Sequence, residues 1–302
     1  MKDKVFIIIP VHNRKSITLK CLDTLEQNGD LAQFSVIVVD DGSTDGTSSA
    51  IQERFPEVQI LQGDGNLWWT GAICMGMKHA INRGAEYLIW LNDDCLPAPN
   101  SILFLLQLVI ADSNRVAGGN IIDPQTGRTL YSGINYFPYP PQLVTQFTDD
   151  SLVECDTLSG NLVCLSQKLV NDIGLPNYKL FPHYNGELMY LFKAKKKGYS
   201  ICICPSAIGY AEPKIEKYIS LSLLNTKTEC CIDISQRFNV KYPSYWKADL
   251  SAYFLVYGMK GFIYRVMSIL SITLIVMLLP KNTREFLHRP IMNIYNKVRY
   301  VL

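Results

Sequence analysis

The segment Tyr87–Cys95, YLIWLNDDC, joins a short apolar run to two adjacent carboxylates. Its first five residues are almost continuously apolar, which is typical of a strand buried on both faces of a parallel sheet. Asn92, Asp93 and Asp94 follow directly, where this strand is expected to leave the sheet. Because ligands of open α/β sheets bind outside the carboxyl ends of strands, the two acids favour a divalent cation that holds a phosphate-bearing ligand. The alternative is a turn in which an aspartate caps the chain before two prolines.

The residues before this segment alternate between strand and helix patterns. Each predicted strand is a short apolar run, followed by a polar loop and then by apolar residues at helical spacing. This order predicts a doubly wound α/β fold with a mostly parallel sheet. Loops that follow parallel strands share one edge, so the polar loops are expected to converge. The predicted strands are residues 5–9, 35–39, 58–61 and 87–91, and the helices are 16–27, one that ends near 55, and about 72–82.

The second half of the domain continues with strands and helices to about residue 205. Ser159, Gly160 and Asn161 are predicted to form a tight turn between two consecutive strands. The predicted strands of this half are residues 116–119, 130–136, 155–158, 162–165 and 199–204, and the helices are 99–112, 166–174 and 187–197.

Composition limits the classes of protein that these 302 residues allow. A hydrophobic fraction of 48% with 19% charged residues supports a sizeable core and excludes global disorder. The net charge of +2 gives no reason to expect a nucleic-acid partner. Nine cysteines without zinc-ligand spacing predict reduced thiols, and the apolar run at residues 5–9 is too short for a signal peptide. Both features predict a cytoplasmic location.

The chain changes character after about residue 221, since residues 261–279 carry one charge, Arg265, and residues 266–279 carry none. The shorter stretch falls below the roughly 20 residues that span a bilayer, whereas the longer one suffices if Arg265 reaches the interface. A basic segment follows, and we expect a helical extension that associates with an anionic membrane surface, either spanning it or lying on it. The alternative is a core helix with a solvated tail. The basic residues are Lys281, Arg284, Arg289, Lys297 and Arg299, against the single Glu285.

Four motifs occur in a fixed order along the first third of the chain. They are IIIPVHNR at residues 7–14, VVDDGSTDGT at 38–47, GNLWWTGA at 65–72 and NDD at 92–94. Together they resemble the inverting glycosyltransferases of family 2, which have the GT-A fold, a Rossmann-like, mostly parallel sheet with helices on both faces. The GNLWWTGA wording is similar to the rhamnosyltransferase-like members that build bacterial surface polysaccharides. The resemblance covers roughly residues 4–205.

The resemblance implies a donor site for a nucleoside diphosphate sugar. Asp40 or Asp41 would bind the base and ribose, although DDGS is also good turn chemistry. Trp68 and Trp69 either stack on the base or sugar or pack under their loop. The other implied donor-binding residues are Pro10, Val11, Asn13, Asn66, Gly71, Asn92 and Asp93.

The resemblance also implies a metal. Asp94 would be the direct ligand of Mg²⁺ or Mn²⁺, and Asp93 would face the ribose or the donor sugar. The cation would neutralise the diphosphate as it leaves. Asn92 stands where many members carry an aspartate, so this site has one negative charge fewer.

An inverting transfer needs a general base near the acceptor hydroxyl. The segment NGELMYLFKAKKKGY, residues 185–199, matches the family frame for that base and places Glu187 in the first turn of a helix. The helix dipole is expected to keep Glu187 ionised, and the alternative is ordinary N-terminal helix charge. Gly186 and Met189 replace acids that are common there. His183 is the rival base, and Gly160 and Asn161 are expected to line the acceptor site.

These expectations combine into one function. Residues 1–220 would form the glycosyltransferase domain, with about 1–115 binding the nucleotide sugar and 116–220 the acceptor, and residues 221–302 would form the membrane-associating extension. The reaction would be a metal-dependent, inverting sugar transfer to a saccharide or lipid-linked saccharide at the cytoplasmic face of the inner membrane. The main alternative is a non-catalytic nucleotide-sugar-binding or scaffold protein. A nucleotidyltransferase is expected to have a glycine-rich loop with basic residues after the first strand, and the segment VHNR contains no glycine. The donor, the linkage and the oligomeric state are left open.

Overall fold

The computed structural model describes residues 2–147, 149–213, 238–240, 242 and 245–278. The main sheet consists of β1 (Val5–Val11), β2 (Ser35–Asp40), β3 (Gln59–Gln62), β4 (Tyr87–Leu91), β5 (Leu96–Pro97), β6 (Arg115–Ile122), β7 (Thr129–Tyr131), β10 (Val153–Glu154), β12 (Leu162–Ser166) and β13 (Ser200–Tyr210). A smaller sheet consists of β8 (Gly133–Asn135), β9 (Gln142–Leu143) and β11 (Thr157–Leu158). The helices are α1 (Lys15–Gln27), α2 (Asp30–Gln33), α3 (Thr47–Arg54), α4 (Trp68–Asn82), α5 (Ser101–Ala111), α6 (Gln167–Ile173), α7 (Gly186–Lys196) and α10 (Trp246–Leu278), which follow the short 3₁₀ turn Lys2–Lys4.

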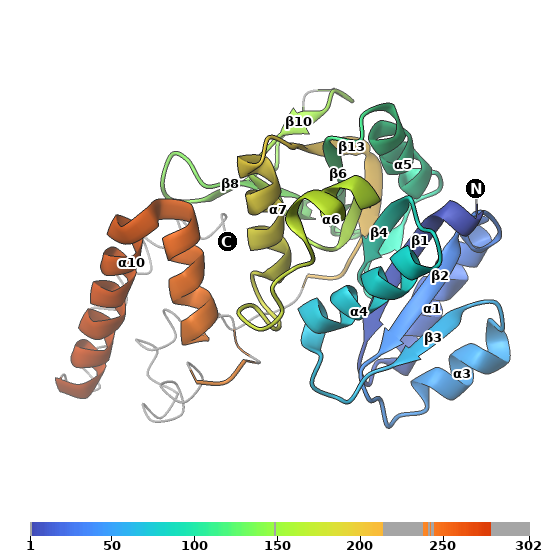
Figure 1. The fold of residues 1–302 in the computed structure, drawn as a ribbon, viewed down its shortest axis with the longest axis horizontal. Coiled ribbons are helices and arrows are strands. Elements are labelled where there is room, and N and C mark those ends of the chain that lie inside the picture. The colour runs from blue at the N-terminus through green and yellow to red at the C-terminus, as the bar shows by residue number, and fades with distance from the viewer. Residues whose placement is uncertain (1, 148, 214–237, 241, 243–244, 279–302) are drawn as a thin grey trace.

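The first four strands form the parallel half of the main sheet. The spatial order along the sheet is β10-β13-β6-β12-β4-β1-β2-β3, with β1 paired in parallel to both β2 and β4, and β2 to β3. The loops that follow these four strands therefore lie at one edge, as the sequence predicts. The mostly parallel α/β architecture with helices around it is confirmed (Figure 1).

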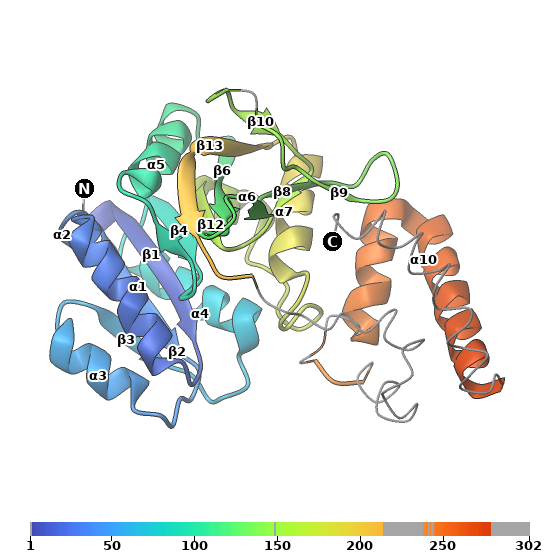
Figure 2. The ribbon, with the colours of Figure 1, turned by 180° about the vertical axis from the view of Figure 1, so that it is seen from behind.

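Helices cover both faces of the sheet because alternate residues of β1 point to opposite sides. Ile7 and Ile9 pack with α1 and α5, whereas Phe6 and Ile8 pack with α4. All four side chains are almost completely buried, and each such burial stabilises the fold by about 1.5–3 kcal/mol. Seen from behind, α1 and α5 lie in front of the sheet (Figure 2).

Strand β12 runs antiparallel between β4 and β6, and the strand before it belongs to the other sheet. Residues 155–165 were expected to form a strand, a tight turn and a strand. In the structure, β11 pairs with β8 in the smaller sheet, while β12 pairs with β4 and β6 in the main sheet. The predicted turn therefore crosses between the two sheets, and the Ser159 N–H donates to the Ser132 carbonyl at 2.9 Å. The crossing places Asn161 directly beside the end of β4.

Other elements also differ from the sequence patterns, and the predicted strand at residues 130–136 is two strands, β7 in the main sheet and β8 in the smaller one. Helix α4 begins at Trp68 rather than near residue 72, because the Trp-rich part of its motif forms the first turn. Strand β13 extends to Tyr210, since its pairing with β6 continues beyond a register shift between Cys204 and Ile208.

Helix α10 is a hairpin of two helical arms that meet at Gly258, whose φ is 68° and ψ is −157° (Figure 1). Arg265 of the second arm donates to the Asp249 carboxylate of the first at 2.9 and 3.0 Å, and its guanidinium lies 4.9 Å from the ring centre of Tyr253. Arg265 thus joins the two arms of the hairpin through Asp249, whereas the sequence suggested that its side chain extends to the membrane interface. Residue 279 and the basic segment after Pro280 lie outside the described residues.

Within the part of the chain that the structure describes, none of the helices combines the length with the apolar character that crossing a bilayer requires.

Candidate active site

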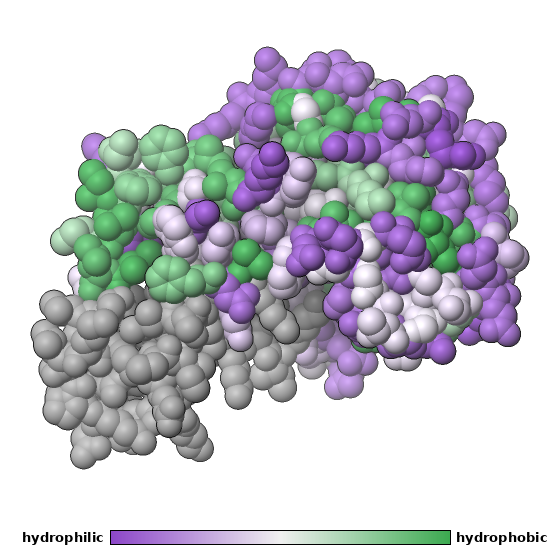
Figure 3. All heavy atoms as spheres, turned by 60° about the horizontal axis from the view of Figure 1, so that its bottom comes forward, coloured by the Kyte–Doolittle hydropathy of each residue, from purple (hydrophilic) through white to green (hydrophobic). Residues whose placement is uncertain are grey.

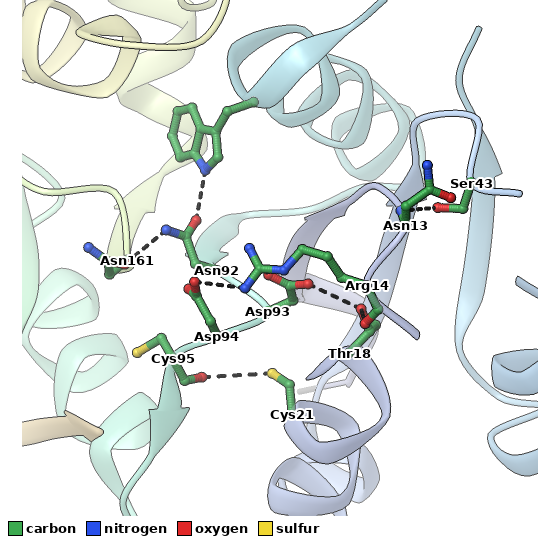
Figure 4. Close-up of polar contacts among 11 residues, drawn as sticks. Asn13, Arg14, Thr18, Cys21, Ser43, Asn92, Asp93, Asp94, Cys95 and Asn161 are labelled. Atoms are coloured by element: carbon green, nitrogen blue, oxygen red, sulfur yellow. Dashed lines mark hydrogen bonds and ion pairs between the residues drawn. The ribbon is translucent and has the colours of Figure 1, made fainter. Parts of the chain in front are cut away.

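The loops after β1 and β2 are joined by hydrogen bonds into one wall. Asn13 has a positive φ of 52°, and its N–H donates to the Ser43 hydroxyl at 2.8 Å (Figure 4). The Thr44 N–H donates to Asn13 Oδ1 at 2.7 Å. Val11 is buried, accepts from the Asp41 N–H, and follows the partly exposed Pro10. Asn13 therefore fixes the wall with its own side chain.

Asp40 and Asp41 are both buried and shape the loops around them. Asp40 accepts from the Ser43 N–H at 2.9 Å and from the Ser48 hydroxyl. Asp41 accepts from the N–H of Gly65 at 2.8 Å and from that of Trp68 at 2.9 Å. Every carboxylate oxygen thus has a partner inside the chain, and contact with a nucleotide, which stays a prediction, would use the remaining lone pairs.

The loop before α4 carries an unusual backbone. Trp68 has a positive φ of 55°, which costs a non-glycine residue about 1–3 kcal/mol and is tolerated where the surroundings hold it. Here the hydrogen bond from the Trp68 N–H to Asp41 stabilises this conformation. Asn66 is exposed and Gly71 lies inside the first turn of α4, where an added Cβ would be 3.3 Å from Leu67 Cβ. Nucleotide contact at Asn66 and Gly71 stays a prediction.

Asn92 connects the Trp-rich loop to the turn before β12. Its Oδ1 accepts from the Trp69 indole N–H at 2.7 Å, and its Nδ2 donates to Asn161 Oδ1 at 2.8 Å (Figure 4). The backbone N–H of Asn92 also donates to the Asn161 carbonyl at 3.0 Å. The Trp69 ring packs edge-on against Trp90 at 5.7 Å. In this arrangement Asn92 bridges two loops, and Trp69 packs beneath its loop.

Asp93 and Asp94 share one arginine. Arg14 Nη1 lies 3.2 Å from Asp93 Oδ1, and Arg14 Nη2 donates to Asp94 Oδ2 at 2.8 Å (Figure 4). The Thr18 hydroxyl donates to Asp93 Oδ2 at 3.2 Å. The Asp93 side chain is 3% exposed and that of Asp94 is 16% exposed. Asp94 is therefore the more accessible of the two carboxylates.

The donor set at this edge fits a hard divalent cation. Among the described residues, no group of three or more His, Cys, Asp or Glu side chains is placed to hold a metal ion. Mg²⁺ in phosphate-binding sites is commonly held by one or two carboxylates, with substrate phosphates and water completing the shell. The partly exposed Asp94 oxygen suits that arrangement, once its bond to Arg14 is released.

Glu187 begins α7 beside the turn that carries Gly160. Its Oε2 is buried and has no hydrogen-bond partner among the described residues, and the same holds for Thr70 Oγ1. Burial raises the pKa of Glu187 from 4.5 to about 7, against the lowering effect of the Glu187 and Leu188 N–H groups. The expectation that the helix dipole keeps this carboxylate fully ionised is therefore wrong, because loss of water outweighs it. A carboxyl that titrates near 7 suits a general base.

Gly186 occupies the place of a common acid because the chains approach closely there. An added Cβ would collide with the Thr70 side chain, and the Thr70 N–H donates to the Pro182 carbonyl at 3.0 Å. His183, the rival base, lies in the same loop, with its ring centre 5.5 Å from that of Trp68. The start of α4 and the start of α7 are thus packed together.

Gly160→Ala is expected to lower catalytic turnover by about 10- to 100-fold while costing only about 1–3 kcal/mol of unfolding free energy. The new Cβ would lie 2.6 Å from Trp69 Cζ2 and 3.2 Å from Glu187 Cβ, so both side chains would shift within the site. Steady-state kinetics and urea unfolding of the same preparation measure the two effects. Wild-type turnover in this variant would contradict the close packing of Glu187, Gly160 and Trp69.

The sequence predictions did not include three residues of this site. Arg14 follows β1, the parallel neighbour of β4, so strand order alone would have placed it beside the acids. Thr18 lies one turn later on α1. Thr70 carries no local signal, because only the packing of α4 on the 182–187 loop buries its hydroxyl.

The fold and the site together define the class: an α/β domain of the GT-A type found in glycosyltransferases. The chain superposes on GalNAc-T7 with UDP, GalNAc and Mn²⁺ with a TM-score of 0.58 and 14% identity, covering 84% of this chain and 57% of that one. It superposes on the Pyrobaculum calidifontis mannosyltransferase PcManGT in complex with GDP-Man and Mn²⁺ with a TM-score of 0.54 and 14% identity, covering 95% and 84%. The predicted fold is confirmed.

Residues 6–163 match the model of glycosyl transferase family 2, and the chain belongs to this family. A curated relative, the UDP-N-acetylglucosamine–dolichyl-phosphate N-acetylglucosaminyltransferase of Methanococcus voltae, is 28% identical over 147 residues, which are 43% of this chain and 57% of the relative. The first curated relatives are matched over about three fifths of their own length.

Proposed function

We propose that this protein transfers a sugar from a nucleoside diphosphate sugar to an acceptor hydroxyl, with inversion at the anomeric carbon. One observation carries the proposal: Glu187, with a buried oxygen that lacks a partner in the described chain, is linked to the acidic strand end. Gly160 touches both Glu187 and Trp69, and Trp69 is bonded to Asn92 beside Asp93. A base and a donor-binding edge thus belong to one continuous cluster.

Each side chain has one task in this reaction. Glu187 Oε2 accepts the proton of the acceptor hydroxyl, whose oxygen attacks the anomeric carbon as the bond to the diphosphate breaks. The Gly160–Asn161 turn supports the acceptor beside Glu187. The wall formed by Asn13, Asp40 and Asp41 holds the nucleoside. A divalent cation at Asp94, Mg²⁺ or Mn²⁺, supplies neutralisation of the leaving diphosphate.

The comparisons indicate which substrates to test first. The two structural neighbours named above contain UDP or GDP-mannose with Mn²⁺. The curated relative from Methanococcus voltae is named for UDP-N-acetylglucosamine and for dolichyl phosphate, a lipid phosphate. We therefore propose a saccharide or lipid-linked saccharide acceptor and retain the rhamnosyltransferase-like, surface-polysaccharide role as a prediction.

The decisive experiment is release of nucleoside diphosphate from a panel of UDP, GDP and TDP sugars, with Mg²⁺, Mn²⁺ or chelator, in the presence of membrane lipid extract. Metal-dependent release from one donor supports the proposed transfer. Binding of a donor without release, with the acceptor supplied as lipid extract and as free saccharides, would favour the non-catalytic scaffold instead.

The α10 hairpin supports the proposed membrane association. Its first arm packs on the domain through Ala248 and Val256, which lie in one cluster with Phe192 of α7, and Lys196 donates to the Leu255 carbonyl at 2.6 Å. The outer side is apolar and exposed, and Figure 3 shows it as a continuous hydrophobic region. The exposed large apolar residues among those described for the hairpin are Trp246, Phe254, Leu255, Met259, Ile263, Tyr264, Met267 and Leu270.

This exposed face, continued by Phe137 and Tyr139, matches a lipid surface. Tyr139 contacts the rings of Tyr257 and Tyr264, so the loop between β8 and β9 and the hairpin form one patch. Phe192 and Glu187 belong to the same helix, α7, so a bilayer at this patch would lie near the acceptor site. Basic residues beyond Pro280 would add attraction to anionic lipids at the cytoplasmic face of the inner membrane.

Replacing Met259, Ile263 and Met267 together by serine is expected to weaken binding to anionic phospholipid vesicles by at least 10-fold. The three side chains are 54–60% exposed, so the fold should tolerate the change, and each loses the free energy of entering the lipid. Vesicle co-sedimentation measures the effect. The control is the double variant Ile17→Ser with Ile110→Ser, which replaces exposed apolar side chains on α1 and α5 instead. Equal binding by the triple variant and the wild type would refute the hairpin's role.

A further inference from the structure

Arg14 lies where a cation is expected between the two acids. Its Nη1 and Nη2 atoms contact different carboxylates, Asp93 at 3.2 Å and Asp94 at 2.8 Å. Two carboxylates at adjacent positions repel unless a positive charge lies between them. The guanidinium of Arg14 supplies that positive charge before any ligand arrives.

Arg14 and a metal ion compete for the Asp94 carboxylate. A divalent cation binds a carboxylate oxygen at about 2.0–2.2 Å, and Asp94 Oδ2 already accepts the Arg14 Nη2–H bond. Bringing a second positive charge to that oxygen places two cations within a few ångströms of one another, which is unfavourable. Binding of the metal at Asp94 therefore weakens the Arg14–Asp94 contact and favours its release.

The two contacts of Arg14 differ in how easily they are released. Asp93 is 3% exposed and is also held by Thr18, whereas the side chains of Asp94 and Arg14 are 16% and 32% exposed. Breaking a buried pair costs more than breaking a partly solvated one. The Asp94 contact is the one that opens, with Arg14 still held by Asp93.

On these grounds we propose that Arg14 is an exchangeable cation: it neutralises Asp93 and Asp94 in the empty site, releases Asp94 when the metal and the diphosphate bind, and then donates to the diphosphate. The planar guanidinium fork fits phosphate oxygens. The charges also balance, because a divalent cation and the diphosphate of a nucleotide sugar carry two opposite charges each, so the net charge around Arg14 is the same before and after binding. Arg14 is here a positioning residue for the donor, and this role rests on the proposed function.

The test is a titration with Mn²⁺ alone, followed by the electron paramagnetic resonance signal of free Mn²⁺. Arg14→Gln is expected to bind Mn²⁺ at least 10-fold more tightly than the wild type, because no guanidinium competes for Asp94. With saturating Mn²⁺, the same variant is expected to bind UDP or GDP at least 10-fold more weakly, because the phosphate loses a donor. A purely structural role for Arg14 would predict no gain in Mn²⁺ affinity.

Two further variants make the result decisive. Arg54→Gln removes the same charge from the surface pair with Asp23 and is expected to bind Mn²⁺ like the wild type. Arg14→Lys keeps the charge but lacks the planar fork that presents two parallel N–H donors, so its Mn²⁺ affinity is expected to lie between those of wild type and Arg14→Gln. This variant replaces Arg14→Gln should the latter not fold. Mn²⁺ affinity at or below the wild-type value in the folded Arg14 variants would overturn the proposal. Because this titration uses no sugar donor, failure of the proposed transfer is detected separately, as absence of diphosphate release by the wild type.

Discussion

Glu187→Gln is expected to lower turnover by about 10²–10⁴-fold, the usual contribution of a general base. The glutamine has the same shape but cannot take up the proton of the acceptor hydroxyl. In the wild type, kcat/KM is expected to fall about tenfold per pH unit below pH 7, because the pKa of Glu187 is raised to about 7. The measurement is nucleoside diphosphate release between pH 5.5 and 8.5.

The same variant is expected to be more stable than the wild type at alkaline pH. A carboxyl whose pKa is higher in the folded chain contributes stability below its unfolded pKa of 4.5, and loses that contribution as the pH rises to about 7. The shift corresponds to roughly 3 kcal/mol at pH 8, an order-of-magnitude value. Urea unfolding of wild type and Glu187→Gln at pH 5 and pH 8 measures it.

These two effects distinguish Glu187 from its rival. If His183 were the base, Glu187→Gln would retain turnover and His183→Gln would lose it. We expect the reverse, with His183→Gln keeping activity within about tenfold of wild type. Loss of stability in Glu187→Gln at pH 8 would contradict the burial that raises its pKa.

Asp94→Asn is expected to lower turnover by at least about 100-fold and to abolish its dependence on Mg²⁺ or Mn²⁺, since the amide oxygen is a weaker ligand for a hard cation. Its cost to the fold should stay within about 1 kcal/mol, because Asp94 is partly exposed and Arg14 keeps its contact with Asp93. Diphosphate release with and without chelator measures the first effect, and urea unfolding the second.

Asp93→Asn is the matched comparison. Asp93 is almost fully buried between Arg14 and Thr18, so the substitution is expected to cost about 2–4 kcal/mol of unfolding free energy. Equal stability of the two variants, or metal-dependent release by Asp94→Asn, would contradict the different roles assigned to the two acids.

The sequence predicted the parts of this molecule that local pattern determines. The runs around Ile8, Val38 and Ile89 indicated buried parallel strands, and parallel strands bring their following loops to one edge. The position of Arg14 next to Asp94 follows from strand order, which the pattern leaves open. The antiparallel insertion of β12 is a long-range pairing, and residues 155–165 carry no local signal that distinguishes it from a hairpin.

The chemistry of individual side chains was harder to predict than their positions. The first turn of a helix suggested an ionised Glu187, but its Oε2 is buried and burial raises its pKa to about 7. The sequence suggested that Asn92 replaces an aspartate of the metal site. In the structure its amide bonds to Trp69 and to Asn161, which lie in two different loops. Both outcomes depend on tertiary contacts that are distant in the sequence.

The bridge from Trp69 through Asn92 to Asn161 has a consequence for protein engineering. The three side chains come from three separate segments and form a chain of two hydrogen bonds. Trp69 donates to Asn92, and Asn92 donates to Asn161. Replacing residues 159–161 by a turn from another protein would remove Asn161, and the Asn92 amide would lose its hydrogen-bond acceptor. New acceptor preferences should therefore be transplanted as a set of three short segments, around residues 69, 92 and 161, and libraries that vary one of them alone are expected to yield mostly inactive chains.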